Sequence, residues 1–397
     1  MLAKKRFSWL RGLGCMAIAA AVSVQGASST LGDFFAATAE VLPNKLALSL
    51  RQEFRYNDNV FEAISSRERG GWISETGATV DWYRSIGLGS YGLVGDLSYE
   101  HYHQFSNELS TVNYSLSPHL VLAGDAGLRN VMLSFHSTSE MTPIDNSETT
   151  DARTFTNGVK AGWEVLGNDK FGLLLAGDWR YVYYSQDDFE DHSNHRYDLS
   201  IAPYYKLSPK TNLGLRLGYA WVRYRNNLQH DDSEDAYLNA FINYRLSQKF
   251  SLMAAAGATR KEYDGVSSGS TGDEDLTMNY DLSLRYLPLA NIALDLLLRH
   301  QAEDSFSNGA RGMSENNSSN LAVTWLINPK TTLSQRLGCS FDDEKTTDLD
   351  TLEYDYDILL SYQWRKSIAV YTGYNYSITH FKYEHDLDYD AHEVRLG

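Results

Sequence analysis

Cysteine is almost absent from this chain, which has two among 397 residues. Cys15 lies in an N-terminal apolar segment that we predict to be removed, so Cys339 would remain alone in the mature protein. A single cysteine excludes an intramolecular disulfide. The stability of the mature chain must therefore come from another source.

Long hydrophobic runs are absent after residue 24. A membrane-spanning helix needs about 18 or more consecutive apolar residues, so none is predicted beyond that point. Proline is scarce as well, with 7 residues, whereas aromatic residues make up 13% of the chain and include 27 Tyr. Tyr and Trp favour β-strands, and their abundance therefore points to β structure.

Basic residues are too few for one class of partner. Lys and Arg number 35 against 51 Asp and Glu, which gives a formal net charge of -16. Binding to nucleic acid requires cations that neutralise several phosphates, so no nucleic-acid partner is expected.

Residues 1–26 have the form of a Sec signal peptide. The basic residues Lys4, Lys5, Arg6 and Arg11 accompany an apolar run over residues 13–24, and small residues follow near the end of the run. The alternatives are a membrane anchor, for which the run is short, and lipidation at Cys15, which precedes the run instead of following it. Removal of these four basic residues would change the net charge from -16 to -20.

Most of the remaining chain alternates between apolar and polar residues. In 276–287, 352–364 and 211–222, Leu, Tyr and Trp occupy one face and polar or charged residues the other. Each segment has about 10 residues or more, the length that a tilted strand needs to cross a bilayer. Soluble β-sandwiches, the alternative, have shorter strands of about 5–6 residues, and charges would be costly inside their solid core.

The connections between these segments alternate in length. Short turns such as 208–211, 247–249 and 328–331 alternate with long polar loops such as 138–152 and 304–317. This pattern is typical of outer-membrane barrels with short periplasmic turns and long extracellular loops. We predict an all-β, antiparallel up-and-down transmembrane barrel over residues 44–397. We expect about 18 strands, with 16 as the alternative, preceded by a short periplasmic segment at 27–43.

One element resembles a known family. The Tyr-containing strand 46–56 continues into Asn57-Asp58-Asn59-Val60-Phe61, and this early strand is similar to that of the β-barrel porin 2 family. The resemblance implies an outer-membrane barrel, brings no catalytic residues, and includes relatives associated with exopolysaccharide or exosortase systems. One departure is the C-terminus, Val394-Arg395-Leu396-Gly397, because such barrels usually end in an aromatic residue. The last strand is expected to be a few residues short.

Charged residues on the polar faces are predicted to line the lumen. An excess of acids over arginines among them predicts a mild preference for cations. By strand parity, the pore-lining residues are Arg51, Glu53, Arg55, Asp81, Asp96, Glu100, Asp178, Arg180, Arg216, Asp281, Arg285, Asp295, Arg299, Glu353, Asp355 and Asp357.

No metal site, cofactor or catalytic residue is predicted. Gly87–Gly92 matches G-x-G-x-x-G, but an alternating strand follows it where a dinucleotide site needs a helix. The pairs Asp96 with His101 and Asp295 with His300 are candidates from proximity alone. Acidic loop pairs would bind divalent ions weakly or simply be solvated. These pairs contain Asp187, Asp188, Asp231, Asp232, Asp342 and Asp343.

The sequence thus predicts an outer-membrane channel that passes ions or small hydrophilic solutes by passive diffusion. Its expected partners are outer-membrane lipid, lipopolysaccharide and the barrel-assembly machinery. The alternative is a structural or export component of a surface-polysaccharide or exosortase-associated system, with polysaccharide-export partners. A barrel enzyme is the third hypothesis.

Overall fold

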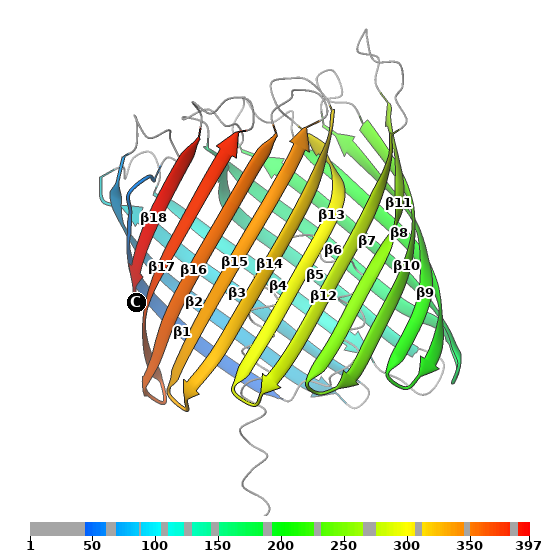
Figure 1. Ribbon diagram of the computed structural model, residues 1–397, viewed down its shortest axis with the longest axis horizontal. Helices are drawn as coiled ribbons and strands as arrows, with labels where there is room; N and C mark the ends of the chain where they lie inside the picture. Colours follow the sequence, from blue (N-terminus) through cyan, green and yellow to red (C-terminus); the bar gives the residue numbers. More distant parts are fainter. Residues whose placement is uncertain are drawn as a thin grey trace, which may run out of the picture.

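The computed structural model is a closed β-barrel whose strands are tilted relative to the barrel axis (Figure 1). The predicted signal peptide at 1–26 and the segment at 27–43 lie outside the described residues. No helix that could cross a bilayer occurs among the described residues. These residues are 44–60, 69–86, 89–104, 110–122, 129–143, 151–185, 193–225, 232–264, 275–305, 312–344, 350–381 and 388–397.

One antiparallel sheet of 18 strands forms the barrel, and β1 pairs with both β2 and β18 to close it. Neighbours in the sheet are neighbours in the chain, so the predicted up-and-down barrel of about 18 strands is confirmed and the alternative of 16 is wrong. The strands are β1 (Lys45–Asn57), β2 (Gly71–Ile86), β3 (Gly89–Tyr102), β4 (Thr111–Leu122), β5 (Arg129–Pro143), β6 (Asp151–Gly167), β7 (Phe171–Tyr184), β8 (Asn194–Ser208), β9 (Thr211–Tyr224), β10 (Asp232–Ser247), β11 (Phe250–Asp264), β12 (Asp275–Leu289), β13 (Ile292–Ser305), β14 (Gly312–Asn328), β15 (Thr331–Glu344), β16 (Thr351–Arg365), β17 (Ile368–Phe381) and β18 (Tyr389–Leu396).

Short turns join strand pairs at one edge of the barrel, which is the lower edge in Figure 1. A polar side chain just before several of these turns accepts a hydrogen bond from the turn backbone. Ser208 and Ser247 Oγ each accept from an amide two residues later at 3.1 Å, and Asn328 Oδ1 does so at 2.9 Å. The side chain therefore stabilises the turn that its sequence predicts.

The strand register shifts directly before six of these turns. Examples are the shifts between Arg245 and Ser247, Leu326 and Asn328, and Gln363 and Arg365. Each shift places one extra residue on a strand, which increases its local twist and bend. The recurrent bulge lets a turn of two or three residues connect strongly tilted neighbours.

The outward face carries the large apolar side chains. On β1, Leu46, Leu48 and Leu50 are 66%, 72% and 88% exposed, whereas Glu53 on the opposite face is buried. Because the side chains of a strand alternate between two faces, the register extends this assignment around the whole sheet. Apolar exposure on this scale would be unfavourable in water and suits contact with lipid.

The inward face is not polar throughout. Near the short-turn edge of β4–β11, an apolar cluster includes Val121, Met132, Leu174, Tyr204 and Phe241, and Leu174 has no exposed surface. Strand parity predicted polar residues on this face. Here the prediction is wrong, because neighbouring inward side chains can pack against one another and away from lumen water.

A short ladder closes the barrel. β18 has 8 residues and pairs with β1 only over Phe54–Asn57, whereas Lys45–Glu53 pair with β2 alone among the described strands. Figure 1 shows the C-terminus about midway along the wall. The expectation of a short last strand is confirmed.

The segment after β1 adds side-chain ties to this closure. Asp58 Oδ1 accepts a hydrogen bond from the His392 amide at 2.6 Å, and Asn59 Nδ2 donates to the Asp390 carbonyl at 2.9 Å. Asn59 is fully buried. The Asn57-Asp58-Asn59 element of the family resemblance therefore fastens the first strand to the last.

Replacing Asp58 by alanine should weaken this closure. Loss of a carboxylate acceptor for a backbone amide is expected to reduce the free energy of unfolding by about 2 kcal/mol. Urea titration of the refolded barrel, followed by Trp fluorescence, measures the change. Asp169→Ala, in an exposed short turn, should change stability by less than about 0.5 kcal/mol. Equal losses in the two variants would contradict the proposed role of Asp58.

Candidate functional site

The charged interior of the barrel is the candidate site. All of the predicted pore-lining residues lie on the inward face, because the register places them opposite the exposed apolar side chains. On β9 and β10, for example, Arg216 pairs with Asn239 inside and Leu217 with Leu238 outside. Their role in lining a conducting pore remains a prediction.

A first ion cluster lies beside the closure of the barrel. Arg55 contacts Glu100 at 2.9 Å, Glu53 at 3.4 Å, Glu75 at 3.5 Å and Glu393 at 3.6 Å. These five residues come from β1, β2, β3 and β18, and their side chains are each less than one-fifth exposed. One guanidinium therefore connects four strands across the seam.

Arg51 extends this cluster along β1. Its guanidinium pairs with Glu75 and lies 3.8 Å from Asp96. At the start of β1, Lys45 pairs with Asp81. The inner wall formed by β1–β3 and β18 thus contains more carboxylates than cations in these ion pairs, and each arginine contacts several carboxylates.

A second cluster occupies β8–β11. Arg216 lies 3.4 Å from Asp198, which also accepts a hydrogen bond from the Tyr237 hydroxyl at 2.8 Å. Lys261, which is 1% exposed, lies 3.1 Å from Asp235. Such buried charges require partners, because an isolated ion would pay a large desolvation cost.

The other predicted residues form simpler arrangements. Arg299 lies 3.3 Å from Asp281, Arg285 lies 3.8 Å from Asp295, and Arg395 pairs with Asp357. Asp178 and Arg180 face Lys160 and Gly158, respectively, on β6. Glu353 accepts a hydrogen bond from Ser340 at 3.0 Å, while Asp355 lies beside Ser377 in the register.

Sequence reasoning missed many inward charges. Glu75 was missed because its outward neighbours Ser74 and Thr76 are polar and interrupt the alternation that Val80 and Trp82 show further along β2. Others lie on strands whose parity the alternation did reveal, such as Asp198 between Tyr197 and Leu199. The missed residues include Lys45, Glu75, Lys160, Glu164, Arg196, Asp198, Lys206, Asp235, Lys261, Arg336, Glu393 and Arg395, and Asp342 was assigned to a loop.

Aromatic side chains of the inward face lie along the wall. A Cβ added at Gly172, Gly214 or Gly218 would come within 2.0 to 2.6 Å of ring atoms. The rings belong to Tyr204, Phe241 and Tyr237 on the adjacent strand. Each glycine therefore makes room for a ring over its own strand, and the ring projects less far into the lumen.

The acidic pairs predicted to bind divalent ions do not form a metal site in the part of the chain that the structure describes. Asp187, Asp188 and Asp231 lie outside it. Asp232 and Asp342 lie in strands, which corrects their loop assignment: Asp232 accepts from the Tyr224 amide and Asp342 from Asn316. Asp343 also lies in β15.

The candidate catalytic pairs are separated. Asp96 and Asp295 face inward, whereas His101 and His300 face outward on the same strands. The glycine motif at Gly87–Gly92 runs into strand β3 and not into a helix. Neither feature supplies a site for the chemistry considered for it.

Comparisons with known proteins give solved structures only. No family model matches, so the resemblance to the β-barrel porin 2 family stays a prediction. No curated protein matches. The chain is similar to Pseudomonas aeruginosa OccK2 (OpdF), with 12% identity, a TM-score of 0.48, and coverage of 89% of this chain and 98% of that chain.

Two further structures show the same level of similarity. The outer membrane protein OpdK from Pseudomonas aeruginosa has 12% identity and a TM-score of 0.47, over 89% of this chain and 98% of that chain. A BenF-like porin from Pseudomonas fluorescens Pf-5 has 12% identity and a TM-score of 0.47, over 89% and 97%.

Proposed function

We propose that this protein is an outer-membrane channel through which ions or small hydrophilic solutes diffuse passively. The observation that carries the proposal is the contrast between the two faces of the closed barrel. The outward face is aliphatic with aromatic rims, and the inward face carries paired charges. A barrel of about 16 to 18 strands is wide enough for an aqueous lumen.

The aromatic rims have the spacing of a membrane belt. Outward-facing Tyr197 and Tyr205 on β8, like Tyr354 and Tyr362 on β16, are separated by eight residues. At ~3.4 Å per residue and a tilt of ~40°, this corresponds to ~20 Å along the barrel axis. Leu199 and Ile201, which lie between the β8 tyrosines, are 57% and 39% exposed. The spacing is close to the ~25 Å apolar band of outer-membrane barrels.

Location and orientation follow from the same proposal. The N-terminal leader would direct export, the short turns would face the periplasm, and the opposite edge would face the cell exterior. Contact with outer-membrane lipid and lipopolysaccharide, and insertion by the barrel-assembly machinery, belong to this role. It requires no cofactor and no reaction.

Charge is distributed unevenly around the inner wall. Acids outnumber bases on β1–β3 and β16–β18, whereas β6–β11 include the bases Lys160, Arg180, Arg196, Lys206 and Lys261. Opposed charges of this kind set up a transverse field across a pore. Acids outnumber bases only slightly among the inward residues named above, so we expect any preference for cations to be mild.

Single-channel recording tests the function. Refolded protein in a planar bilayer should give steady openings, and in a KCl gradient the reversal potential should be displaced toward that of potassium. Silence from a barrel whose folding is verified by heat-dependent gel migration would overturn the channel. It would favour the structural or export role in a surface-polysaccharide or exosortase-associated system. A displacement toward chloride would overturn the cation preference alone.

A further inference from the structure

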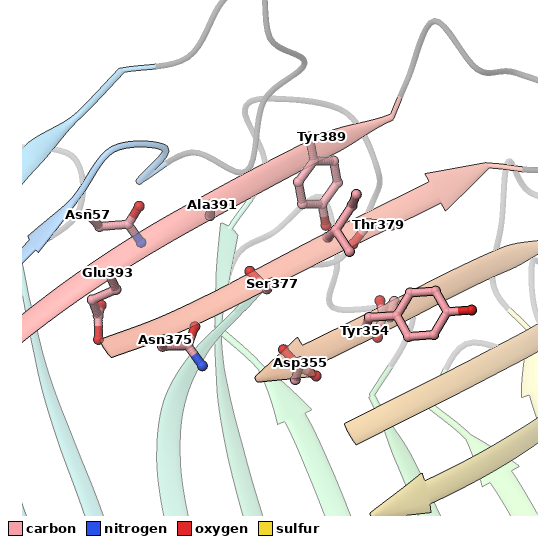
Figure 2. A pocket seen from close by; sticks show the side chains of 11 residues that line it. Asn57, Tyr354, Asp355, Asn375, Ser377, Thr379, Tyr389, Ala391 and Glu393 are labelled. Carbon is pink, nitrogen blue, oxygen red and sulfur yellow. The ribbon is translucent and has the colours of Figure 1, made fainter. Parts of the chain in front are cut away.

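A polar niche of about 320 Å³ lies on the inner wall where β16, β17 and β18 meet the end of β1. Figure 2 shows Asn375, Ser377 and Thr379 following one another along β17. Asp355 lies on one side of this row, and Glu393 on the other. The niche is thus built from consecutive inward positions of adjacent strands.

The charges that line the niche have one sign. Glu353, Asp355 and Glu393 contribute carboxylates, and no Lys or Arg is among the described residues that line it. Glu393 is partly neutralised by Arg55, at 3.6 Å, but Arg55 also contacts three other glutamates. Arg336 on β15 also attracts Asp355 but makes no ion pair with it, so the three carboxylates keep an excess of negative charge. An anionic molecule would therefore be repelled from the niche, and a cationic molecule attracted.

Several polar groups of the niche have unused hydrogen-bonding capacity. Across the described residues, the side chains of Asp355, Asn375, Ser377 and Thr379 make no hydrogen bond, although Thr379 is 5% exposed. The neighbouring Asp357, in contrast, pairs with Arg395, and Glu353 accepts from Ser340. The unpaired hydroxyl of the otherwise buried Thr379 is accessible from the niche and can bond a ligand or solvent there.

The arrangement does not suit a metal ion. No group of three carboxylate, histidine or cysteine side chains close enough to hold one occurs in the described part of the chain. Side chains directly opposite on adjacent strands are about 5 Å apart, and alternate residues on one strand about 7 Å apart. A molecule that reaches Asp355, Ser377 and one neighbour of Ser377 must therefore have the size of a small organic ring.

We propose that this niche binds small hydroxylated organic cations of the amino-sugar class. The ammonium group donates to Asp355, with Glu353 and Glu393 adding attraction. The ring hydroxyls exchange hydrogen bonds with Ser377 and with Asn375 or Thr379. A role of this site in solute selection rests on the channel proposed above, but binding itself does not require conduction.

Three sugars with the same ring separate the contribution of charge to binding from that of the ring hydroxyls. Glucosamine, glucose and glucuronate carry a positive, zero and negative charge, and each is titrated calorimetrically into the refolded full chain in detergent. Glucosamine should bind at least about tenfold more tightly than glucose, and glucuronate should not bind. Asp355→Asn should weaken glucosamine binding by about tenfold or more, because a charge-assisted hydrogen bond is lost. Glu262→Gln, which removes a carboxylate from the outward face of β11, should leave the affinity unchanged.

Several results would overturn the site. They are the absence of glucosamine binding to a folded barrel, glucuronate binding as tight as that of glucosamine, or an unchanged affinity in Asp355→Asn. Failure of the channel is distinguishable from failure of the site. A silent barrel that binds glucosamine through Asp355 retains the site, whereas a conducting barrel that binds none of the sugars loses it.

Discussion

Replacing Arg55 by alanine is expected to lower the free energy of unfolding of the barrel by about 3 kcal/mol. The change would leave four mostly buried glutamates on β1, β2, β3 and β18, of which Glu75 alone keeps an ion pair among the described residues, with Arg51. Breaking a buried ion network by removing one sign of charge costs more than the network contributes, because the remaining charges stay desolvated and repel one another. Denaturant titration of the refolded protein in lipid vesicles measures the loss.

A matched variant separates this effect from loss of any inward arginine. Arg285 pairs with Asp295 at 3.8 Å, and both side chains are more than one-third exposed. Arg285→Ala should therefore cost less than about 1 kcal/mol. Adding Glu100→Gln to Arg55→Ala should recover part of the stability, because Arg55 is the one ion-pair partner of Glu100 among the described residues and its charge is left uncompensated. Equal losses in the two arginine variants, or no recovery in the double variant, would refute the role of Arg55.

Gly257→Ala is expected to be the most damaging single methyl addition to the wall, at about 3 kcal/mol. A Cβ at this position would lie 1.9 Å from the Leu238 carbonyl oxygen and 2.2 Å from Asn239 Oδ1. The first of these atoms belongs to the backbone of β10 and cannot move without separating β10 from β11. We expect a lower unfolding midpoint and a smaller refolded fraction on gels.

Gly338→Ala is the appropriate control. It is also an inward glycine of a strand, but a Cβ there would meet the Asp355 side chain at 3.4 Å, an ordinary contact distance. Its stability should stay within about 0.5 kcal/mol of the unmodified protein. If Gly257→Ala is tolerated as well as Gly338→Ala, the close approach of β10 to Gly257 does not constrain the barrel.

Alternation of apolar and polar residues made the architecture predictable. In 276–287 and 352–364 the alternating apolar residues face outward, as the pattern required, because side chains in a strand alternate strictly between two faces. Leu359 is the exception in the second segment and faces inward. The short turns were equally predictable from the sequence, since Ser208 and Asn328 stabilise their turns through local hydrogen bonds. Strand ends were less predictable: Asp232 and Asp342 extend strands into segments whose composition is that of loops. Hydrogen bonds to a paired neighbour hold these residues, and a single strand does not reveal its neighbour.

By itself, the sequence determined the fold class, the strand number to within two and the inward direction of the predicted charges. These properties depend on local periodicity, which is complete within each strand. Only the tertiary structure decided which charges meet. Arg55 contacts glutamates from four strands, whereas Asp355 lies beside uncharged residues of β17. Such contacts depend on the register and stagger of the strands and on how the barrel closes. Pairing between different strands sets these properties, so the residue pattern of one strand does not predict them.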